Sequence, residues 1–354
     1  MATAAETASR GRTFPTSAIR YLDPATESAI VRLTDPNFNA YLPLPKNRAA
    51  AAKAILYASD FNGKWDAYRM DLKSGESRQL TDAAALDVTS LGSLPGERGF
   101  WHIDNGVLIE TLTGRGQSLK SREVYKIPQG FEKTAEISYS EDSQYAAFVE
   151  KTSGQNAPRY RVQVVRLTNG QARTVVEASE AILDVLLRPK HTSVYYRIGN
   201  RASLVNFDGT GNRQLKLAEG EIGQAQWVSD GHSLLYLNRP LDPKQLTGLR
   251  EHDPEAGTDA LIAGTSQYVH FQANADASMF VGASGSKASP YVLLLSRAGK
   301  REFTLAEHRA GDSSMVAPVF TANSQSILFL SDRHGKPAIY YMPVDKLVSE
   351  TDGS

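Results

Sequence analysis

The stretch ILYASDFNGK at residues 55–64 has a close counterpart in ILFLSDRHGK at residues 327–336. Each copy begins with an apolar run rich in strand-forming residues and reaches a Ser-Asp-x-x-Gly turn. Each then continues into a second apolar run, at residues 67–72 and 338–342. Two such runs joined by this kind of turn predict a β-hairpin, so the same hairpin unit occurs near both ends of the chain.

Further hairpins fill the chain between these two copies, at intervals of about 40–48 residues. The second strands of the repeating units are expected at residues 55–59, 99–103, 145–150, 193–198, 233–237, 279–283 and 326–331. A repeat of this period that contains only strands is typical of propeller blades. We therefore expect an all-β protein, a seven-bladed β-propeller, with an irregular insert at residues 240–257 in the fifth blade.

The seventh blade has no candidate for a fourth strand after Val344. Near the N-terminus, AIVRLTD at residues 29–35 resembles the fourth-strand text SRQLTD at residues 77–82. We expect residues 30–34 to supply the missing outer strand. This pairing would close the ring and cover the edge of a sheet.

The propeller is expected to span residues 20–346, between disordered tails at residues 1–19 and 347–354. Residues 1–12 are small and polar and contain no apolar core of a signal peptide. Two alternatives stay open: a native tail, or the remainder of a removed signal peptide with Met1 added. The protein would be cytoplasmic in the first case and exported to the periplasm in the second.

Composition restricts the class of partner. The chain has 39 Lys and Arg residues and 39 Asp and Glu residues, so its formal net charge is zero. This balance argues against general attraction to nucleic acids or membranes, and no apolar run reaches the roughly 18 residues of a membrane span. There is no cysteine, which excludes disulfides and cysteine metal sites.

Four phrases of the sequence carry a family resemblance. They are YLDPAT with VRLT at residues 21–34, ASDFNG at 58–63, LVNFDG at 204–209 and LFLSD at 328–332. Together they resemble the oligogalacturonide lyase family, seven-bladed propellers of pectin degradation. The resemblance implies β-elimination on acidic, uronate-containing oligosaccharides. It also implies a divalent metal of the manganese type, held by three histidines and a glutamine, with a separate histidine as base beside an arginine.

The residues at the catalytic positions are only partly those of the family. Arg201 aligns with the arginine and would bind a substrate carboxylate in bidentate fashion or assist proton abstraction, unless it is an ordinary surface arginine on a strand. Gln224 stands where the family has its base, and a carboxamide cannot take a proton in that role. His308 would replace it as base if it faced the channel; the alternative is a loop histidine satisfied by hydrogen bonds.

The metal positions depart further from the family pattern. His270 aligns with the first metal-binding histidine, and Asp312 stands in place of the glutamine. Met315 and Ala317 replace the other two histidines. His270 and Asp312 alone make a poor site, so we expect no family-type metal.

Two hypotheses about function follow from these residues. The protein is a lyase-like propeller that binds acidic oligosaccharides of the pectin type and cleaves them weakly or not at all. Alternatively, it is a non-catalytic propeller that binds a sugar or a protein, because a fold does not determine a function.

Overall fold

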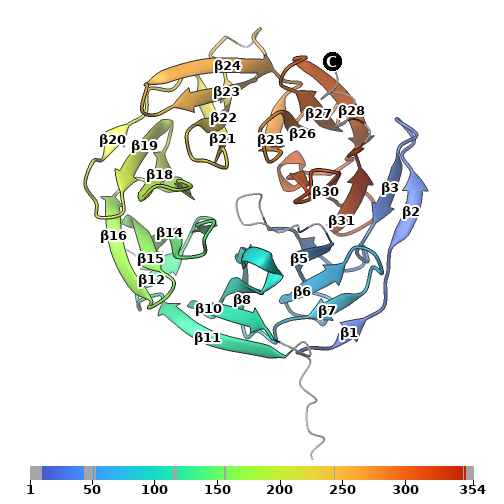
Figure 1. Ribbon diagram of the computed structural model, residues 1–354, viewed down its shortest axis with the longest axis horizontal. Helices are drawn as coiled ribbons and strands as arrows, with labels where there is room; N and C mark the ends of the chain where they lie inside the picture. The colour runs from blue at the N-terminus through green and yellow to red at the C-terminus, as the bar shows by residue number, and fades with distance from the viewer. Residues whose placement is uncertain are drawn as a thin grey trace, which may run out of the picture.

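The computed structural model describes residues 10–43, 51, 53–114, 118–154, 157–242, 244–345 and 347. Its strands form seven antiparallel sheets arranged as blades around a central channel (Figure 1). The seven-bladed, all-β propeller expected from the repeat period is therefore confirmed. Within the described residues, no helix has the length and apolar character needed to cross a lipid bilayer.

The first three blades follow one another around the channel. From the channel outward, blade one contains β4 (Ala40–Tyr41), β5 (Ala54–Ser59), β6 (Asp66–Asp71), β7 (Ser77–Gln79) and β1 (Thr13–Phe14). Blade two contains β8 (Leu86–Ser93), β9 (Gly99–Asp104), β10 (Val107–Thr113) and β11 (Leu119–Lys126), with the 3-10 turn η2 (Pro95–Glu97) between β8 and β9. In blade three, β12 (Phe131–Lys133) and β13 (Ser138–Tyr139) both pair with β14 (Tyr145–Thr152), followed by β15 (Tyr160–Arg166) and β16 (Gln171–Ala178).

Blades four to six each have four strands. Blade four contains β17 (Ile182–Leu187), β18 (Ser193–Ile198), β19 (Arg201–Asn206) and β20 (Arg213–Gln214). Blade five contains β21 (Glu221–Trp227), β22 (Leu234–Arg239), β23 (Gly248–Asp253) and β24 (Thr258–Gly264). Blade six contains β25 (Tyr268–Ala273), β26 (Met279–Ser284), β27 (Tyr291–Ser296) and β28 (Arg301–Glu307). The expectation of an irregular insert at residues 240–257 is wrong, because β23 lies within it. Only one of the six residues of β23 is a large apolar residue, so the sequence pattern of this strand is weak. The pairing of β23 with β22 and β24 decides its extended conformation.

Blade seven joins the two ends of the chain. It contains β29 (Val319–Phe320), β30 (Ser326–Ser331), β31 (Ala338–Pro343), β3 (Ala29–Arg32) and β2 (Ile19–Leu22), with η4 (Ser313–Met315) ahead of β29. Val31 pairs with Tyr341 in the β3–β31 ladder, and the Ile339 nitrogen donates to the Thr34 hydroxyl. The predicted closure by residues 30–34 is confirmed. β2 then adds a further strand outside β3.

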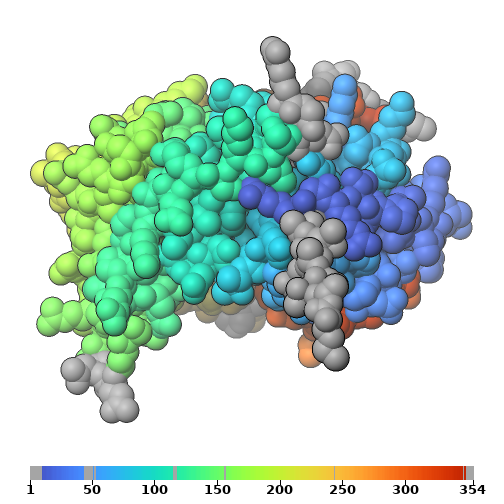
Figure 2. All heavy atoms as spheres, turned by 90° about the horizontal axis from the view of Figure 1, so that it is seen from below, coloured from blue at the N-terminus to red at the C-terminus, as the bar shows by residue number. Residues whose placement is uncertain are grey.

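The N-terminal residues extend this closure to blade one. Residues 10–19 lie in the stretch expected to be a tail, and β1 within it pairs with β7. The Arg10 side chain donates to the Leu80 carbonyl oxygen and to the Ser121 hydroxyl of blade two. Figure 2 shows these dark-blue residues on the outer wall of the ring, reaching the teal surface of blade two. The segment thus holds the outer strands of blades one and two together.

The core lies between neighbouring sheets. At the junction of blades six and seven, Met279 and Val281 pack with Phe329 and Tyr340, all fully buried. Burying a side chain of this size stabilises the fold by about 1.5–3 kcal/mol. Because each blade packs on two neighbours, the inner strands are held rigidly around the channel, and this rigidity positions the site.

Candidate functional site

The predicted site residues come from blades four to seven. Gln224 lies in β21 and His270 in β25, the inner strands of blades five and six. Both strands contain a β-bulge near their beginning, between Ile222 and Ala225 and between Tyr268 and His270. A bulge turns the local side chains away from the regular alternation, which is a common way of aiming residues at a site.

Gln224 connects two blades. Its side-chain oxygen accepts a hydrogen bond at 2.7 Å from the backbone nitrogen of Phe271, the residue that follows His270. The next junction repeats this contact, since the Gln272 side-chain oxygen accepts from the Phe320 nitrogen. The carboxamide of Gln224 therefore links inner strands, in addition to lacking a group that titrates.

His270 interacts with the loop that precedes blade seven. Burial lowers the pKa of His270, whereas the carboxylate of Asp312, a hydrogen bond with the Ser314 backbone and the carboxylate of Asp184 act to raise it. Asp312 is exposed and caps η4 by accepting from the Ser314 nitrogen at 2.8 Å. Hydrogen bonds from Ser314 lower the pKa of Asp312, with a smaller effect from His270. The charges of His270 and Asp312 thus influence each other across β25 and the cap of η4.

His308 bonds to the backbone of its own fold through both ring nitrogens. It is buried, and its Nε2 bonds the Ser284 carbonyl oxygen at 3.0 Å while its Nδ1 accepts from the Ala310 nitrogen at 3.1 Å. This pattern requires the neutral ring with a proton on Nε2. Burial also lowers the pKa of His308. Both ring nitrogens are occupied within the fold, as in the alternative of a loop histidine satisfied by hydrogen bonds.

Arg201 is exposed, as Asp312 is. It begins β19, and its guanidinium lies 2.7 Å from the carboxylate of Glu180, with 57% and 67% of the two side chains exposed. The preceding residue, Asn200, accepts a hydrogen bond from the Ile222 nitrogen at the beginning of β21. Arg201 therefore stands beside the strand that carries Gln224.

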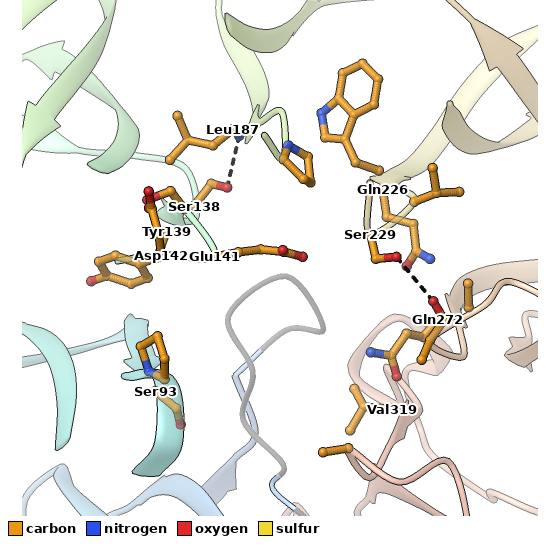
Figure 3. Close-up of a pocket in the computed structure, with 18 of the residues that line it drawn as sticks. Ser93, Ser138, Tyr139, Glu141, Asp142, Leu187, Gln226, Ser229, Gln272 and Val319 are labelled. Atoms are coloured by element: carbon orange, nitrogen blue, oxygen red, sulfur yellow. Dashed lines mark hydrogen bonds between the residues drawn. The ribbon is translucent and has the colours of Figure 1, made fainter. Parts of the chain in front are cut away.

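A cavity of about 1200 Å³ occupies the channel beyond these residues. It is lined by the ends of the inner strands and by the turns that follow them, and none of the five predicted residues lines it. Figure 3 shows Gln226 and Gln272 on its wall and the Glu141 side chain extending into it. The sequence analysis missed this cavity. A signal was present, because Gln226 and Gln272 lie two residues after Gln224 and His270, and alternate residues of a strand share a face.

The charge of this cavity is unfavourable for anions. Six carboxylate and four Lys or Arg side chains line it. Among the cations, Arg188 is paired with Glu255 at 2.6 Å and Arg297 with Glu251. Like charges repel strongly in a concave site with low-dielectric walls. The lining of the cavity thus has a modest excess of acidic over basic side chains.

Two curated proteins are similar to this chain along almost their whole length. An oligogalacturonide lyase of Pectobacterium atrosepticum is 24% identical over 387 residues, covering 95% of this chain and 98% of the relative. An oligogalacturonate lyase of Dickeya dadantii is 22% identical with the same coverage. No family model matches the chain. The resemblance to oligogalacturonide lyases expected from the motifs is therefore confirmed.

Solved structures agree on the fold. An oligogalacturonate lyase in complex with manganese superposes with a TM-score of 0.87 at 21% identity, covering 94% of this chain and 98% of its own. An oligogalacturonate lyase from Vibrio parahaemolyticus superposes with a TM-score of 0.85, also at 21% identity, covering 95% and 98% of the two chains. At this identity the likeness establishes the seven-bladed fold.

The residues of this chain do not fit a manganese ion. In the part of the chain that the structure describes, no group of three or more His, Cys, Asp or Glu side chains converges as metal ligands. His270 and Asp312 interact, but Met315 packs against the core between blades six and seven and Ala317 is a buried alanine. Transition metals need several nitrogen or oxygen donors in a defined geometry. We therefore derive no chemical step through a metal.

Proposed function

We propose that this protein is an oligogalacturonide lyase-like propeller that binds acidic, uronate-containing oligosaccharides of the pectin type without cleaving them by a metal-dependent route. The proposal combines the similarity to curated lyases with the altered residues of the site. Oligosaccharide binding depends on Arg201, and cleavage fails for lack of a base and of metal ligands.

The exposed guanidinium of Arg201 is the observation that carries this proposal. An exposed ion pair such as Arg201–Glu180 contributes only about 0–1 kcal/mol. A uronate carboxylate therefore displaces or joins Glu180 at little cost. Arginine binds a carboxylate through two parallel hydrogen bonds, which requires neither a base nor a metal.

Elimination lacks its proton acceptor. Gln224 has no titrating group and uses its oxygen to bind the Phe271 nitrogen. His308 is enclosed by Ser284 and Ala310. The loss of a positioned general base typically reduces a rate by about 10²–10⁴-fold. The missing metal ligands remove the Lewis acid that would stabilise the carbanion.

A second candidate function is a non-catalytic module that binds a sugar or a protein in the channel. The cavity of about 1200 Å³ favours it, because most ligand sites are concave with a few converging polar groups. Gln226 and Gln272 would supply such groups. The acidic lining favours a ligand without negative charge in this case.

Ultraviolet absorbance on digalacturonate tests the proposal, since β-elimination creates a conjugated double bond. The purified protein is incubated with and without Mn²⁺, and binding is measured in parallel by calorimetry with wild type, Arg201→Gln and Gln226→Ala. We expect binding that Arg201→Gln removes and Gln226→Ala leaves intact, with no rise in absorbance. A sustained rise that requires Mn²⁺ would contradict the proposal, and binding lost only in Gln226→Ala would favour the second candidate.

A further inference from the structure

Asn200 connects the turn that carries Arg201 to the next blade. It follows Gly199, whose φ of 56° forms the tight turn between β18 and β19. Its side-chain oxygen accepts from the Ile222 nitrogen at 2.7 Å, and its side-chain nitrogen donates to the Gly220 carbonyl oxygen. The oxygen and the nitrogen of the Asn200 carboxamide thus both bind the segment that leads into β21.

The segment that receives Asn200 is itself fixed. Gly220 has a φ of 129°, and a Cβ there would lie 2.4 Å from the Arg239 carbonyl oxygen, so only glycine fits. Asn238 of the same blade donates to the Glu219 carbonyl oxygen at 3.2 Å. Asn200 is therefore anchored on a rigid support rather than on a loose loop.

Arg201 has one firm contact at its backbone and one weak contact at its guanidinium. The backbone of the turn is held from blade five by Asn200, and the guanidinium is held by Glu180, which lies between blades three and four. An arginine side chain has many rotamers, and fixing its base reduces the entropy lost on binding. Without Asn200, the turn and the arginine would sample a wider range of positions.

We propose that Asn200 is a positioning residue that holds Arg201 for recognition of a uronate carboxylate. The inference rests on the proposed function, because it concerns the same site. Asn200 need not touch the ligand. It acts through the backbone of the turn and through its attachment to the strand that carries Gln224.

Substitutions of Asn200 test this inference, with a matched control in blade two. Asn200→Ala removes both hydrogen bonds, and Asn200→Asp keeps the acceptor for the Ile222 nitrogen but loses the donor to Gly220. Asn105 occupies the equivalent turn between β9 and β10, and its side chain forms no hydrogen bond with other described residues. Asn105→Asp therefore makes the same change of shape and charge without breaking a link between blades.

Calorimetric titration with digalacturonate at low and high salt is the measurement. We expect both Asn200 variants to bind about five- to tenfold more weakly at low salt, as for the loss of a supporting hydrogen bond, and Asn105→Asp to stay within about twofold. The salt dependence of affinity should become shallower than that of wild type. A change in fold stability alone would lower the unfolding midpoint without changing the salt dependence.

The outcomes separate this inference from the proposed function. If Arg201→Gln loses binding while both Asn200 variants bind as wild type, the positioning role is wrong and the proposed function stands. If the Asn200 variants weaken binding but keep the salt dependence of wild type, the positioning role is also wrong. If Arg201→Gln binds as tightly as wild type, the proposed function fails, and the inference fails with it.

Discussion

The side-chain oxygen of Gln224 lies 2.7 Å from the backbone nitrogen of Phe271 and joins the inner strands of blades five and six. The family resemblance assigns a catalytic histidine to the position of Gln224. In this chain the same position instead satisfies a backbone donor of the neighbouring blade. The Gln224 amide therefore helps to hold blades five and six together and serves a structural role.

Replacing Gln224 by alanine should destabilise the protein by about 1–3 kcal/mol, because the Phe271 nitrogen loses its acceptor. Denaturant unfolding followed by tryptophan fluorescence measures this change. Gln226→Ala is the matched control. Gln226 lies two residues further along β21, and its side chain makes no hydrogen bond with other described residues. We expect the control to change stability by less than about 0.5 kcal/mol; equal effects of the two variants would contradict the structural role of Gln224.

A buried ion pair between Asp23 and Arg333 joins the two ends of the chain in blade seven. Their side chains are 0% and 4% exposed, and their charged atoms lie 3.2 Å apart across 310 residues of sequence. Asp23→Asn leaves a buried guanidinium without its counter-charge, which should cost about 3–5 kcal/mol. Asp82→Asn disrupts the exposed Lys64–Asp82 pair and should cost less than about 1 kcal/mol. Similar unfolding free energies for the two variants would show that the Asp23 pair does not hold the ring closed.

Acid should destabilise the fold through His102. This side chain is 4% exposed, and burial lowers its pKa from 6.5 to about 4. Between these values the unfolded chain binds the proton and the folded chain does not, so stability is lost as the pH falls through this window. The loss amounts to about 3 kcal/mol at pH 4 relative to pH 7.

The pH profile of the unfolding free energy tests this prediction. In His102→Phe the loss between pH 7 and pH 4 should be smaller than in wild type by about that amount. His232→Ala, whose side chain is 66% exposed, serves as the control and should follow wild type. Parallel profiles for wild type and His102→Phe would exclude His102 as a source of acid sensitivity.

The blades and their closure could be predicted from the sequence because the signal is local and repeated. Residues 30–34 read like the other fourth strands, and their apolar positions match the edge that they cover. The outermost strands β1 and β2 carry no such signal. Thr13–Phe14 is too short to show a period, and its conformation depends on pairing with β7. The extended conformation of these strands is determined by pairing with other strands rather than by their own sequence.

The site could be predicted only in part for a similar reason. The residue types at Gln224, Met315 and Ala317 showed which chemical groups are missing. The burial of His308 depends on Ser284, which is 24 residues away in sequence. The cavity is formed by turns from several blades, and the sequence of a single turn does not indicate that it lines a cavity.

Calorimetric titration of digalacturonate into wild type and Arg201→Gln tests the central claim most directly. Glutamine is shorter than arginine but keeps a polar side chain without the charge at this exposed position, so the fold is preserved while the carboxylate loses its partner. We predict saturable binding to wild type that weakens with added salt, and no measurable binding to Arg201→Gln. Equal binding by both proteins, or no binding by wild type at low salt, would contradict the claim that this propeller recognises uronates through Arg201.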